Sequence, residues 1–324
     1  MVPKFFFRYE TTESEERDYL REQRATFVMA PREMSRERLL QIIKAYIPHG
    51  NIVFGVSYEP YVEGFDGQTQ FRMLDKNPVV DVAQKIASSD SPRSLTVLEY
   101  SQETVDDVIR MLRPRHLVIV RGSYRFAFHR RSIYRLLTKR HIPFELISPF
   151  VDEVEARRYE HQIISGWDDP VALTPGDDMM MFDLADQISH RSFDYCFQTG
   201  CVLSTKSEGG MYQPIVATYN QVIPFHTYAL HYGSAREENL SDLHDTNHYD
   251  TIHAEMAALV QMTRQPQGMQ NLTLHIGLLP CPNCARTLSQ TGLREVVYRL
   301  DHSDGYAADL FSKCNIIVRK AEEL

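Results

Sequence analysis

The feature that most constrains this chain is a pair of short motifs in its last third. The motifs are His253-Ala254-Glu255 and Pro280-Cys281-Pro282-Asn283-Cys284. One imidazole and two thiolates occupy three corners of a zinc tetrahedron and leave the fourth open for water, as a catalytic zinc site requires. Glu255 is not needed to bind the metal, so it is free to move protons. The two motifs are therefore predicted to meet at one zinc ion.

Each motif is expected at the start of a helix. The segment His253–Met262 is a predicted helix, and Asn283–Thr291 is another. Cys281 and Cys284 are three residues apart, so they fall on one face of the turn that enters the second helix. The free N–H groups and the dipole of a helix N-terminus favour anions and help to hold thiolate charge. This local structure suits the proposed ligands.

The motifs indicate a particular chemistry. A zinc ion lowers the pKa of a bound water from 15.7 toward roughly 7 in favourable sites, and the hydroxide can attack an amidine-like carbon such as C4 of cytosine. Glu255 would take the water proton, protonate the ring nitrogen and then deliver a proton to departing ammonia. The alternative is a structural zinc knuckle, for which Cys314 is a candidate fourth ligand. Cys314 is also interpreted as a buried apolar thiol.

Length and composition limit the number of domains, the partners and the cellular compartment. The chain has 324 residues, enough for two domains, and its composition is that of a globular protein with 43% hydrophobic and 24% charged residues. A net charge of -8 argues against non-specific nucleic-acid binding by the whole molecule. No apolar run approaches the roughly 18 residues that span a bilayer. Five cysteines with one close pair suggest metal binding in a reducing compartment. We expect a cytoplasmic protein without a membrane partner.

Residues 1–164 alternate helix and strand patterns. The predicted helices are Ser35–Tyr46, Pro78–Ala87, Gln102–Leu112 and Arg131–Arg140. Short apolar runs that suit buried strands are Ile52–Val56, Leu95–Leu98, Leu117–Val120 and Phe144–Ile147. This alternation predicts βαβ units and an α/β domain with a mostly parallel sheet.

A polar stretch at residues 165–178 is interpreted as a linker, and residues 179–324 as a second domain. A helical pattern covers Met180–Arg191. The predicted strands of this domain are Gly200–Leu203, Ile215–Thr218, Leu272–Gly277, Val296–Leu300 and Ile316–Arg319. The first two strands are expected to form a hairpin.

Over about residues 180–320 the sequence resembles the cytidine and deoxycytidylate deaminase superfamily. Beyond the two motifs, the segment 217–220 (Ala-Thr-Tyr-Asn) resembles the strand end whose Asn binds the sugar hydroxyl, and Leu288–Tyr298 is similar to the helix–turn–strand after the cysteines. The resemblance implies a three-layer α/β/α fold around a mixed five-stranded sheet. It also implies roles for six residues: zinc ligands His253, Cys281 and Cys284, proton shuttle Glu255, and substrate contacts Asn220 and the backbone of Ala254.

The resemblance implies a zinc-dependent hydrolase that acts on an amidine C–N bond of a pyrimidine nucleotide, with one zinc per chain. Conversion of dCMP to dUMP is the leading hypothesis, and relatives are commonly oligomers, so we expect a homo-oligomer. Thr218 stands where the deoxycytidylate branch usually has Gly, and Ala257 where it often has Asn. These differences concern the sugar and base preference, not the reaction type. Asn220 has a second interpretation as a turn residue.

Two other functions stay open. One is a polynucleotide deaminase that acts on a base of tRNA, RNA or single-stranded DNA. The other is a non-catalytic nucleotide sensor with a deaminase fold; the intact Glu255 speaks against it. A defensive role that drains a nucleotide pool is compatible with the same chemistry as nucleotide metabolism.

The segment His226–His248, which also holds His231 and His244, lies between the motifs. Deoxycytidylate deaminases have an insertion here, in some cases with a second, structural metal. The simpler interpretation is a solvated acidic loop with scattered histidines.

Residues 113–140 carry nine Lys and Arg and no Asp or Glu. Within them, Arg121-Gly122-Ser123-Tyr124-Arg125 follows a predicted strand, and parallel sheets bind ligands at the carboxyl ends of their strands. We therefore expect an anion pocket with Arg121, Ser123 and Arg125, for the phosphate of a nucleotide effector or a nucleic-acid backbone. The alternative is a solvated basic helix face that pairs with acidic segments such as Asp152–Glu160. The glycine spacing fits neither a P-loop nor a dinucleotide fingerprint.

Overall fold

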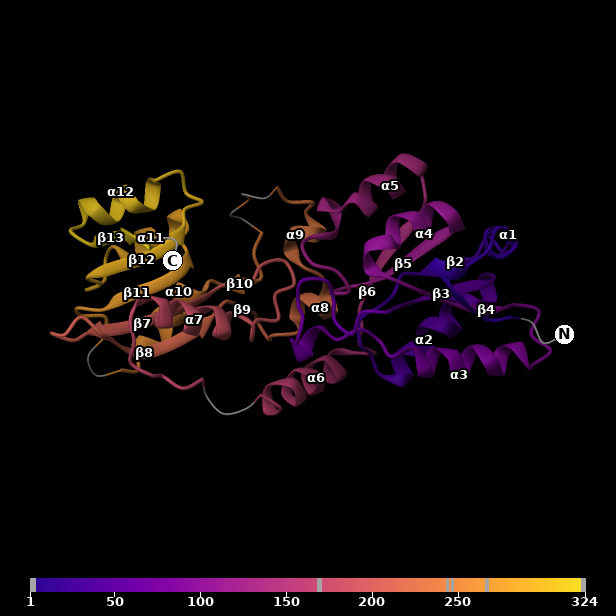
Figure 1. Ribbon diagram of the computed structural model, residues 1–324, viewed down its shortest axis with the longest axis horizontal. Coiled ribbons are helices and arrows are strands. Elements are labelled where there is room, and N and C mark those ends of the chain that lie inside the picture. The colour runs from indigo at the N-terminus through magenta and orange to yellow at the C-terminus, as the bar shows by residue number, and fades with distance from the viewer. Residues whose placement is uncertain (1–3, 168–170, 243–244, 246–247, 266–267, 322–324) are drawn as a thin grey trace. The chain divides into compact units, whose positions relative to one another are not determined.

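The computed structural model describes residues 4–167, 171–242, 245, 248–265 and 268–321 (Figure 1). The chain forms two compact units. The first comprises Met1–Ile164 together with Thr227–Tyr249, and the second comprises Ser165–His226 and Asp250–Leu324. The segment Thr227–Tyr249 thus packs with the first unit, although it lies within the second domain predicted from the sequence. In the described part of the chain, no helix is long and apolar enough to cross a membrane.

The first unit is built on a six-stranded sheet in which every strand pair is parallel. In spatial order its strands are β1 (Phe6–Arg8), β4 (Leu95–Tyr100), β3 (Ile52–Ser57), β2 (Thr26–Val28), β5 (His116–Val120) and β6 (Phe144–Ile147). The predicted α/β class with a parallel sheet is confirmed. The sequence patterns missed β1 and β2, because three-residue strands are too short to show a period.

Helices cover both faces of this sheet, as buried parallel strands require. Helices α2 (Arg36–Tyr46) and α3 (Lys76–Ala87) pack on one face, and α4 (Val105–Leu112) lies on the other with α1 (Ser14–Glu22) and α5 (Ser132–Arg140) (Figure 1). Helix α6 (Glu153–Ser165) ends the continuous part of the unit. The Ser35 side chain caps α2 by accepting the Arg38 N–H at 3.1 Å.

The strand order places a topological switch point between β2 and β5. From β2 the chain continues to β3 and β4 on one side, and β5 and β6 then add on the other side of β2. The connections that leave β2 and β5 therefore go to opposite faces of the sheet, and the crevice between their carboxyl ends is where ligands bind in open parallel sheets.

The second unit contains a mixed five-stranded sheet. In spatial order its strands are β13 (Ile317–Lys320), β12 (Glu295–Leu300), β11 (Thr273–Leu278), β7 (Gly200–Lys206) and β8 (Tyr212–Tyr219). The pairs β7–β8 and β7–β11 are antiparallel, whereas β11–β12 and β12–β13 are parallel. The expected hairpin and the expected mixed sheet are both confirmed.

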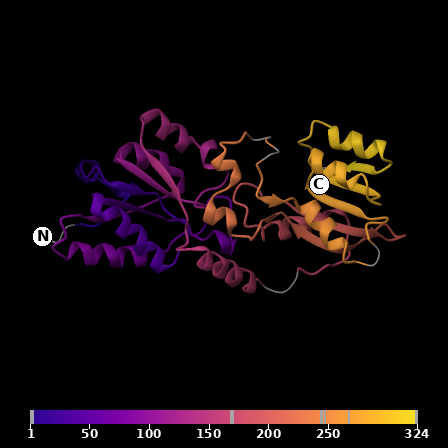
Figure 2. The ribbon, with the colours of Figure 1, turned by 180° about the vertical axis from the view of Figure 1, so that it is seen from behind.

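Helices lie on both faces of the second sheet as well (Figure 2). Along β7, Cys201 and Leu203 face the core formed by α10 (Ala254–Met262), α11 (Pro282–Leu288) and α12 (Tyr306–Lys313). The intervening Val202 packs instead with α7 (Asp178–Ser189). Neighbouring side chains of a strand point to opposite faces. The sheet is therefore the middle layer of the predicted α/β/α sandwich.

In the second unit, β9 (Gln221–Val222) pairs antiparallel with β10 (Thr251–Ile252), and the segment Thr227–Tyr249 lies between these two strands in the sequence. Its helices α8 (Tyr228–Tyr232) and α9 (Ala235–Glu238) pack within the first unit (Figures 1 and 2). Glu237 is only 6% exposed. Its carboxylate accepts hydrogen bonds from the Tyr124 hydroxyl at 2.9 Å and the Phe128 N–H at 2.8 Å. The described part of this segment is thus largely packed and not a freely solvated loop.

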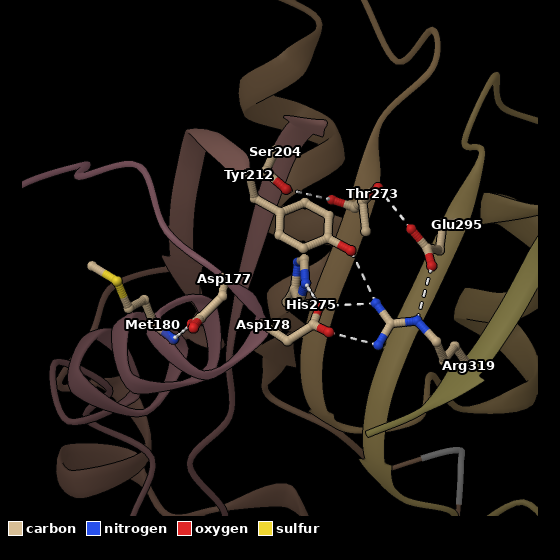
Figure 3. A network of polar contacts seen from close by, with 9 residues as sticks. All are labelled: Asp177, Asp178, Met180, Ser204, Tyr212, Thr273, His275, Glu295 and Arg319. Atoms are coloured by element: carbon tan, nitrogen blue, oxygen red, sulfur yellow. Dashed lines mark hydrogen bonds and ion pairs between the residues drawn. The ribbon is translucent and has the colours of Figure 1, made fainter. Parts of the chain in front are cut away.

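A polar network on the α7 face ties the start of that helix to the last strand (Figure 3). Arg319 of β13 donates to both carboxylate oxygens of Asp178, at 2.6 and 2.9 Å. The same guanidinium reaches Glu295 at 3.1 Å and the Tyr212 hydroxyl at 2.9 Å. Nε2 of the buried His275 lies 2.9 Å from Asp178. One arginine therefore links α7 to β8, β12 and β13.

Replacing Arg319 with methionine is expected to lower the free energy of unfolding by about 1–3 kcal/mol at pH 7, since it leaves two carboxylates without their strongest donor. Burial alone would raise the pKa of Asp178, but hydrogen bonds from Arg319 and His275 outweigh it and hold that pKa well below its ordinary value. A depressed carboxyl pKa stabilises the fold above the unfolded value of about 3.9, and this stability disappears as the pH falls through the folded pKa. The difference between wild type and variant should therefore be full above about pH 4 and shrink below it.

Urea unfolding of Arg299→Met provides the control for this network. Arg299 also binds α7, through Asp186 at 2.6 Å and over the Phe182 ring, but its carboxylate partner is 56% exposed, whereas Asp178 is 30% exposed. An exposed pair contributes roughly 0–1 kcal/mol. Equal losses in the two variants would contradict a special role for the Arg319 network.

Candidate active site and metal centre

Two helix N-termini of the second unit bring the motif residues together. His253 is the N-cap residue of α10, and Cys281 is the N-cap residue of α11, which has Pro282 in its first turn. The His253 Nδ1 atom lies 3.6 Å from Cys281 Sγ and 3.5 Å from Cys284 Sγ. With a Glu255 carboxylate oxygen, these ligand atoms all lie within 4.8 Å of one another. The residues expected to meet at the metal thus form one cluster.

The spacing of the three ligand atoms fits zinc. Tetrahedral zinc with Zn–S of about 2.3 Å and Zn–N of about 2.1 Å separates sulfur and nitrogen by about 3.6 Å. The two distances from His253 Nδ1, 3.5 and 3.6 Å, match this value. Within the described residues this is the one group of His, Cys, Asp or Glu placed to hold a metal. Cys314, the candidate fourth ligand of a zinc knuckle, lies at the C-terminal end of α12 and packs against the hydrophobic core instead.

The cysteine sulfurs contact each other closely enough to share a proton. A hydrogen bond from Cys284 lowers the pKa of the Cys281 thiol, and the same contact raises the pKa of Cys284. A divalent cation removes this competition, because a coordinating thiol is deprotonated outright. The pair is therefore poised to exchange its proton for a metal.

Glu255 lies in the first turn of α10 and is only 4% exposed. One of its carboxylate oxygens lies 4.0 Å from His253 Nδ1. Burial raises the pKa of Glu255, and the nearby His253 works in the opposite direction. A buried carboxyl with a raised pKa both accepts and releases protons more readily near neutral pH than an exposed one.

Asn220 follows β8 and is buried, with its side-chain amide engaged by the loop before β7. Its Oδ1 accepts the Thr199 N–H at 2.9 Å, and its Nδ2 donates to the Phe197 carbonyl at 2.8 Å and to Asp194 at 3.2 Å. Asp194 also accepts the Thr251 hydroxyl at 3.0 Å, two residues before His253. Sequence reasoning missed Asp194 and Thr251, because only the fold brings their segments together. The predicted sugar contact of Asn220 stays a prediction.

The structure also describes the surroundings of the other predicted site residues, Ala254, Arg121, Ser123 and Arg125. Ala254 is fully buried at the first position of α10, and its backbone contact to the substrate ring stays a prediction.

The three side chains predicted to bind an anion lie in the first unit. Arg121 donates to the His231 carbonyl at 3.1 Å and lies 3.6 Å from Glu238. Ser123 Oγ accepts a backbone N–H. Arg125 is exposed, with its guanidinium over the Phe65 and Phe126 rings. The three predicted anion-binding side chains thus have separate partners. His244, part of the hypothetical second metal site, lies outside the described residues.

Comparison with known proteins finds a family match in the C-terminal half of the chain. Residues 177–300 match the model of the cytidine and deoxycytidylate deaminase zinc-binding region. This stretch contains both motifs and most of the mixed sheet. Residues 177–300, in the C-terminal half of the chain, are therefore similar to the cytidine and deoxycytidylate deaminase superfamily, as the resemblance implied. The match does not include residues 1–164 of the first unit, but it spans the segment Thr227–Tyr249.

Several proteins named deoxycytidylate or dCMP deaminase match part of this chain. The deoxycytidylate deaminase of Enterobacteria phage T2 is 36% identical over 47 residues, which are 14% of this chain and 25% of that protein. That of Saccharomyces cerevisiae is 29% identical over 126 residues, 39% of this chain and 38% of that protein. The crystal structure of the dCMP deaminase of cyanophage S-TIM5 with dCMP and dUMP is 20% identical, covers 44% of this chain and 95% of that chain, and has a TM-score of 0.34. The chain thus matches well under half the length of the phage T2 and Saccharomyces cerevisiae proteins.

Proposed function

We propose that this protein is a zinc-dependent hydrolase that deaminates a pyrimidine nucleotide, with dCMP converted to dUMP. The observation that carries the proposal is the cluster of His253, Cys281 and Cys284 beside the buried carboxyl of Glu255. Three ligands leave one zinc position open, and a carboxyl that does not complete the set stands next to it. The names of the partial relatives support a deoxycytidylate substrate.

The zinc ligands and Glu255 would have separate roles in the proposed reaction. His253, Cys281 and Cys284 would hold the zinc ion, which lowers the pKa of a water bound to it. Glu255 would accept a proton from water and pass it to the ring nitrogen next to C4. It would then take the second proton from the oxygen added at C4 and deliver it to the amino group, so that the C4 carbonyl forms and ammonia leaves. Burial of Glu255 suits both transfers, because the group must be neutral and charged in turn.

Asn220 would contribute mainly through the loop that it holds. Its three hydrogen bonds to Asp194, Phe197 and Thr199 fix the segment before β7. Asp194 connects this segment to Thr251, and hence to the strand that leads into His253. An amide oxygen can accept two hydrogen bonds, so that of Asn220 would accept a sugar hydroxyl in addition to the Thr199 N–H.

A substrate panel tests the proposal. The zinc-loaded protein is incubated with deoxycytidine, dCMP, dCTP, CMP, adenosine, and short single-stranded RNA and DNA, and ammonia release is measured. We expect dCMP to give the highest kcat/KM, since recognition of one phosphate and a deoxyribose separates it from every other compound in the panel. Turnover only on RNA or DNA, with a steep dependence on salt, would replace the proposal with a polynucleotide deaminase. Absence of turnover on all of them would leave the non-catalytic sensor.

A further inference from the structure

The loop before β7 contains a carboxylate, Asp194, whose two oxygens accept four hydrogen bonds. Oδ1 accepts the backbone N–H groups of Cys196 at 2.7 Å and Phe197 at 3.1 Å, which fixes the carboxylate on its own loop. Oδ2 accepts hydrogen bonds from the amide nitrogen of Asn220 at 3.2 Å and from the Thr251 hydroxyl at 3.0 Å. One oxygen therefore sets the position of the carboxylate, and the other holds two segments that lie far away in the sequence.

The Asn220 side chain is buried and held in one orientation. Besides the bond to Asp194, its Nδ2 donates to the Phe197 carbonyl at 2.8 Å, and its Oδ1 accepts the Thr199 N–H at 2.9 Å. An amide turned the other way would place its oxygen against the Asp194 carboxylate and the Phe197 carbonyl, with its NH2 group against the Thr199 N–H. Of these partners Asp194 alone is charged, and hydrogen bonds to charged groups contribute more than neutral ones. Asp194 is therefore the main determinant of which end of the amide is the acceptor.

Thr251 connects the same oxygen to the strand that leads into the metal cluster. It lies in β10, which pairs with β9, and His253 follows two residues later. Asn220 directly precedes β9. The Asp194 side chain therefore joins Asn220 to the segment of His253 through hydrogen bonds that do not depend on the short ladder of β9 and β10.

The surroundings of Asp194 require a group that accepts at both ends. Two backbone N–H groups donate to one oxygen, and an amide and a hydroxyl donate to the other. An ionised carboxylate accepts at both oxygens, whereas an amide of the same shape must turn its NH2 group toward one pair of donors. The Thr251 hydroxyl can accept as well as donate, so an amide at position 194 loses less with its NH2 group on that side. This orientation breaks the bond to Asn220.

We propose that Asp194 is a positioning residue for sugar recognition, which fixes the Asn220 amide so that its Oδ1 accepts the 3′-hydroxyl of the substrate deoxyribose. The proposal rests on the proposed function, in which Asn220 accepts a sugar hydroxyl. In dCMP the hydroxyl at C3′ is the free one, because C5′ carries the phosphate and C2′ carries only hydrogen. Asp194 acts through Asn220 and contacts neither the zinc ion nor the pyrimidine ring.

The test compares the binding of dCMP and of 2′,3′-dideoxycytidine 5′-monophosphate, which lacks the 3′-hydroxyl, to the full chain. Calorimetric titration uses the zinc-loaded Glu255→Gln protein, so that neither ligand is turned over. With Asp194 intact, dCMP should bind about five- to tenfold more tightly than the dideoxy ligand, the contribution of one hydrogen bond. With Asp194→Asn added, dCMP should bind as weakly as the dideoxy ligand, whose own dissociation constant should change by less than about threefold.

Asp301→Asn is the matched control in the same background. Asp301 also closes a loop of the second unit, by accepting the backbone N–H groups of Ser303 at 2.7 Å and Gly305 at 2.8 Å, but it is exposed. It should leave the ratio of the two dissociation constants unchanged. An unchanged ratio in Asp194→Asn would overturn the proposal. Weakening of both ligands by the same factor would also overturn it, because a general loss of structure has that effect.

Activity and binding separate this proposal from the proposed function. A wild type that binds dCMP without deaminating it would contradict the proposed function and leave the binding comparison intact. Equal binding of the two ligands with Asp194 intact would overturn the role of Asp194 whatever the activity. If Asp194→Asn does not fold, hydrogen exchange in the wild type decides. The side-chain NH2 group of Asn220 should then exchange with solvent more slowly than that of the exposed Asn283, and equal rates would overturn the proposal.

Discussion

Replacing Glu255 with glutamine is expected to lower kcat for deamination by about 10²–10⁴-fold, the range that general acid–base groups contribute. Glutamine keeps the shape of the side chain but neither accepts nor donates the proton that a carboxyl group transfers. Glu255 is not counted among the three proposed ligands, so the variant should keep the zinc content of the wild type. Steady-state kinetics with dCMP and metal analysis of the same preparation measure both quantities.

The control for this substitution is Glu208→Gln, which makes the same chemical change at an exposed position of the second unit. It should leave kcat unchanged. A Glu255→Gln variant that keeps kcat within tenfold of the wild type would remove Glu255 from the proposed mechanism. Loss of zinc from that variant would instead make Glu255 a ligand and favour a structural metal site.

Replacing Cys284 with serine should abolish stable zinc binding. The buried Cys284 supplies one of three ligands, and its Sγ lies 3.5 Å from His253 Nδ1. Changing a residue that only orients a ligand costs roughly 10–100-fold in metal affinity, so removal of a ligand should cost more. We therefore expect about one zinc per chain in the wild type, far less in the variant, loss of deamination and a lower melting temperature, because bound metal stabilises the folded chain.

Cys314→Ser provides the matched control, since Cys314 is a half-buried cysteine of the same unit outside the ligand cluster. It should keep zinc, activity and melting temperature. Zinc retained at wild-type affinity by Cys284→Ser would show that the metal sits elsewhere. Equal losses from both cysteine variants would indicate a knuckle that includes Cys314.

The cluster of His253, Glu255, Cys281 and Cys284 could be predicted from the sequence, because most of its geometry is local. Each motif is a helix start, so the positions of Cys281 and Cys284 relative to each other follow from one turn of backbone. The fold of the second unit was also predictable, because its strands and helices are long enough to show a hydrophobic periodicity in the sequence. In the first unit, β1 and β2 are only three residues long, and their patterns are hidden.

The predicted anion pocket shows what residues close in the sequence do not reveal, namely which side chains distant segments will bury. The sequence drew attention to Arg121 and Arg125 because they stand in a cluster of nine positive residues at 113–140. Arg32 stands outside that cluster and looks like any surface arginine in the sequence, yet it is completely buried. Its burial results from segments that lie far from it in the sequence, notably Phe71, Gly122 and Tyr159.

The sequence by itself determined which residues of the second unit form the cluster proposed to hold a metal, which carboxyl lies beside them, and which helices present them. Only the tertiary structure decided that Thr227–Tyr249 packs with the first unit, that Asp194 and Thr251 share the surroundings of Asn220, and that Arg32 is buried at the switch point. The physical reason is the range of the interactions. Hydrogen bonds within one helical turn are encoded by neighbouring residues, whereas burial of a side chain depends on every distant segment that packs against it.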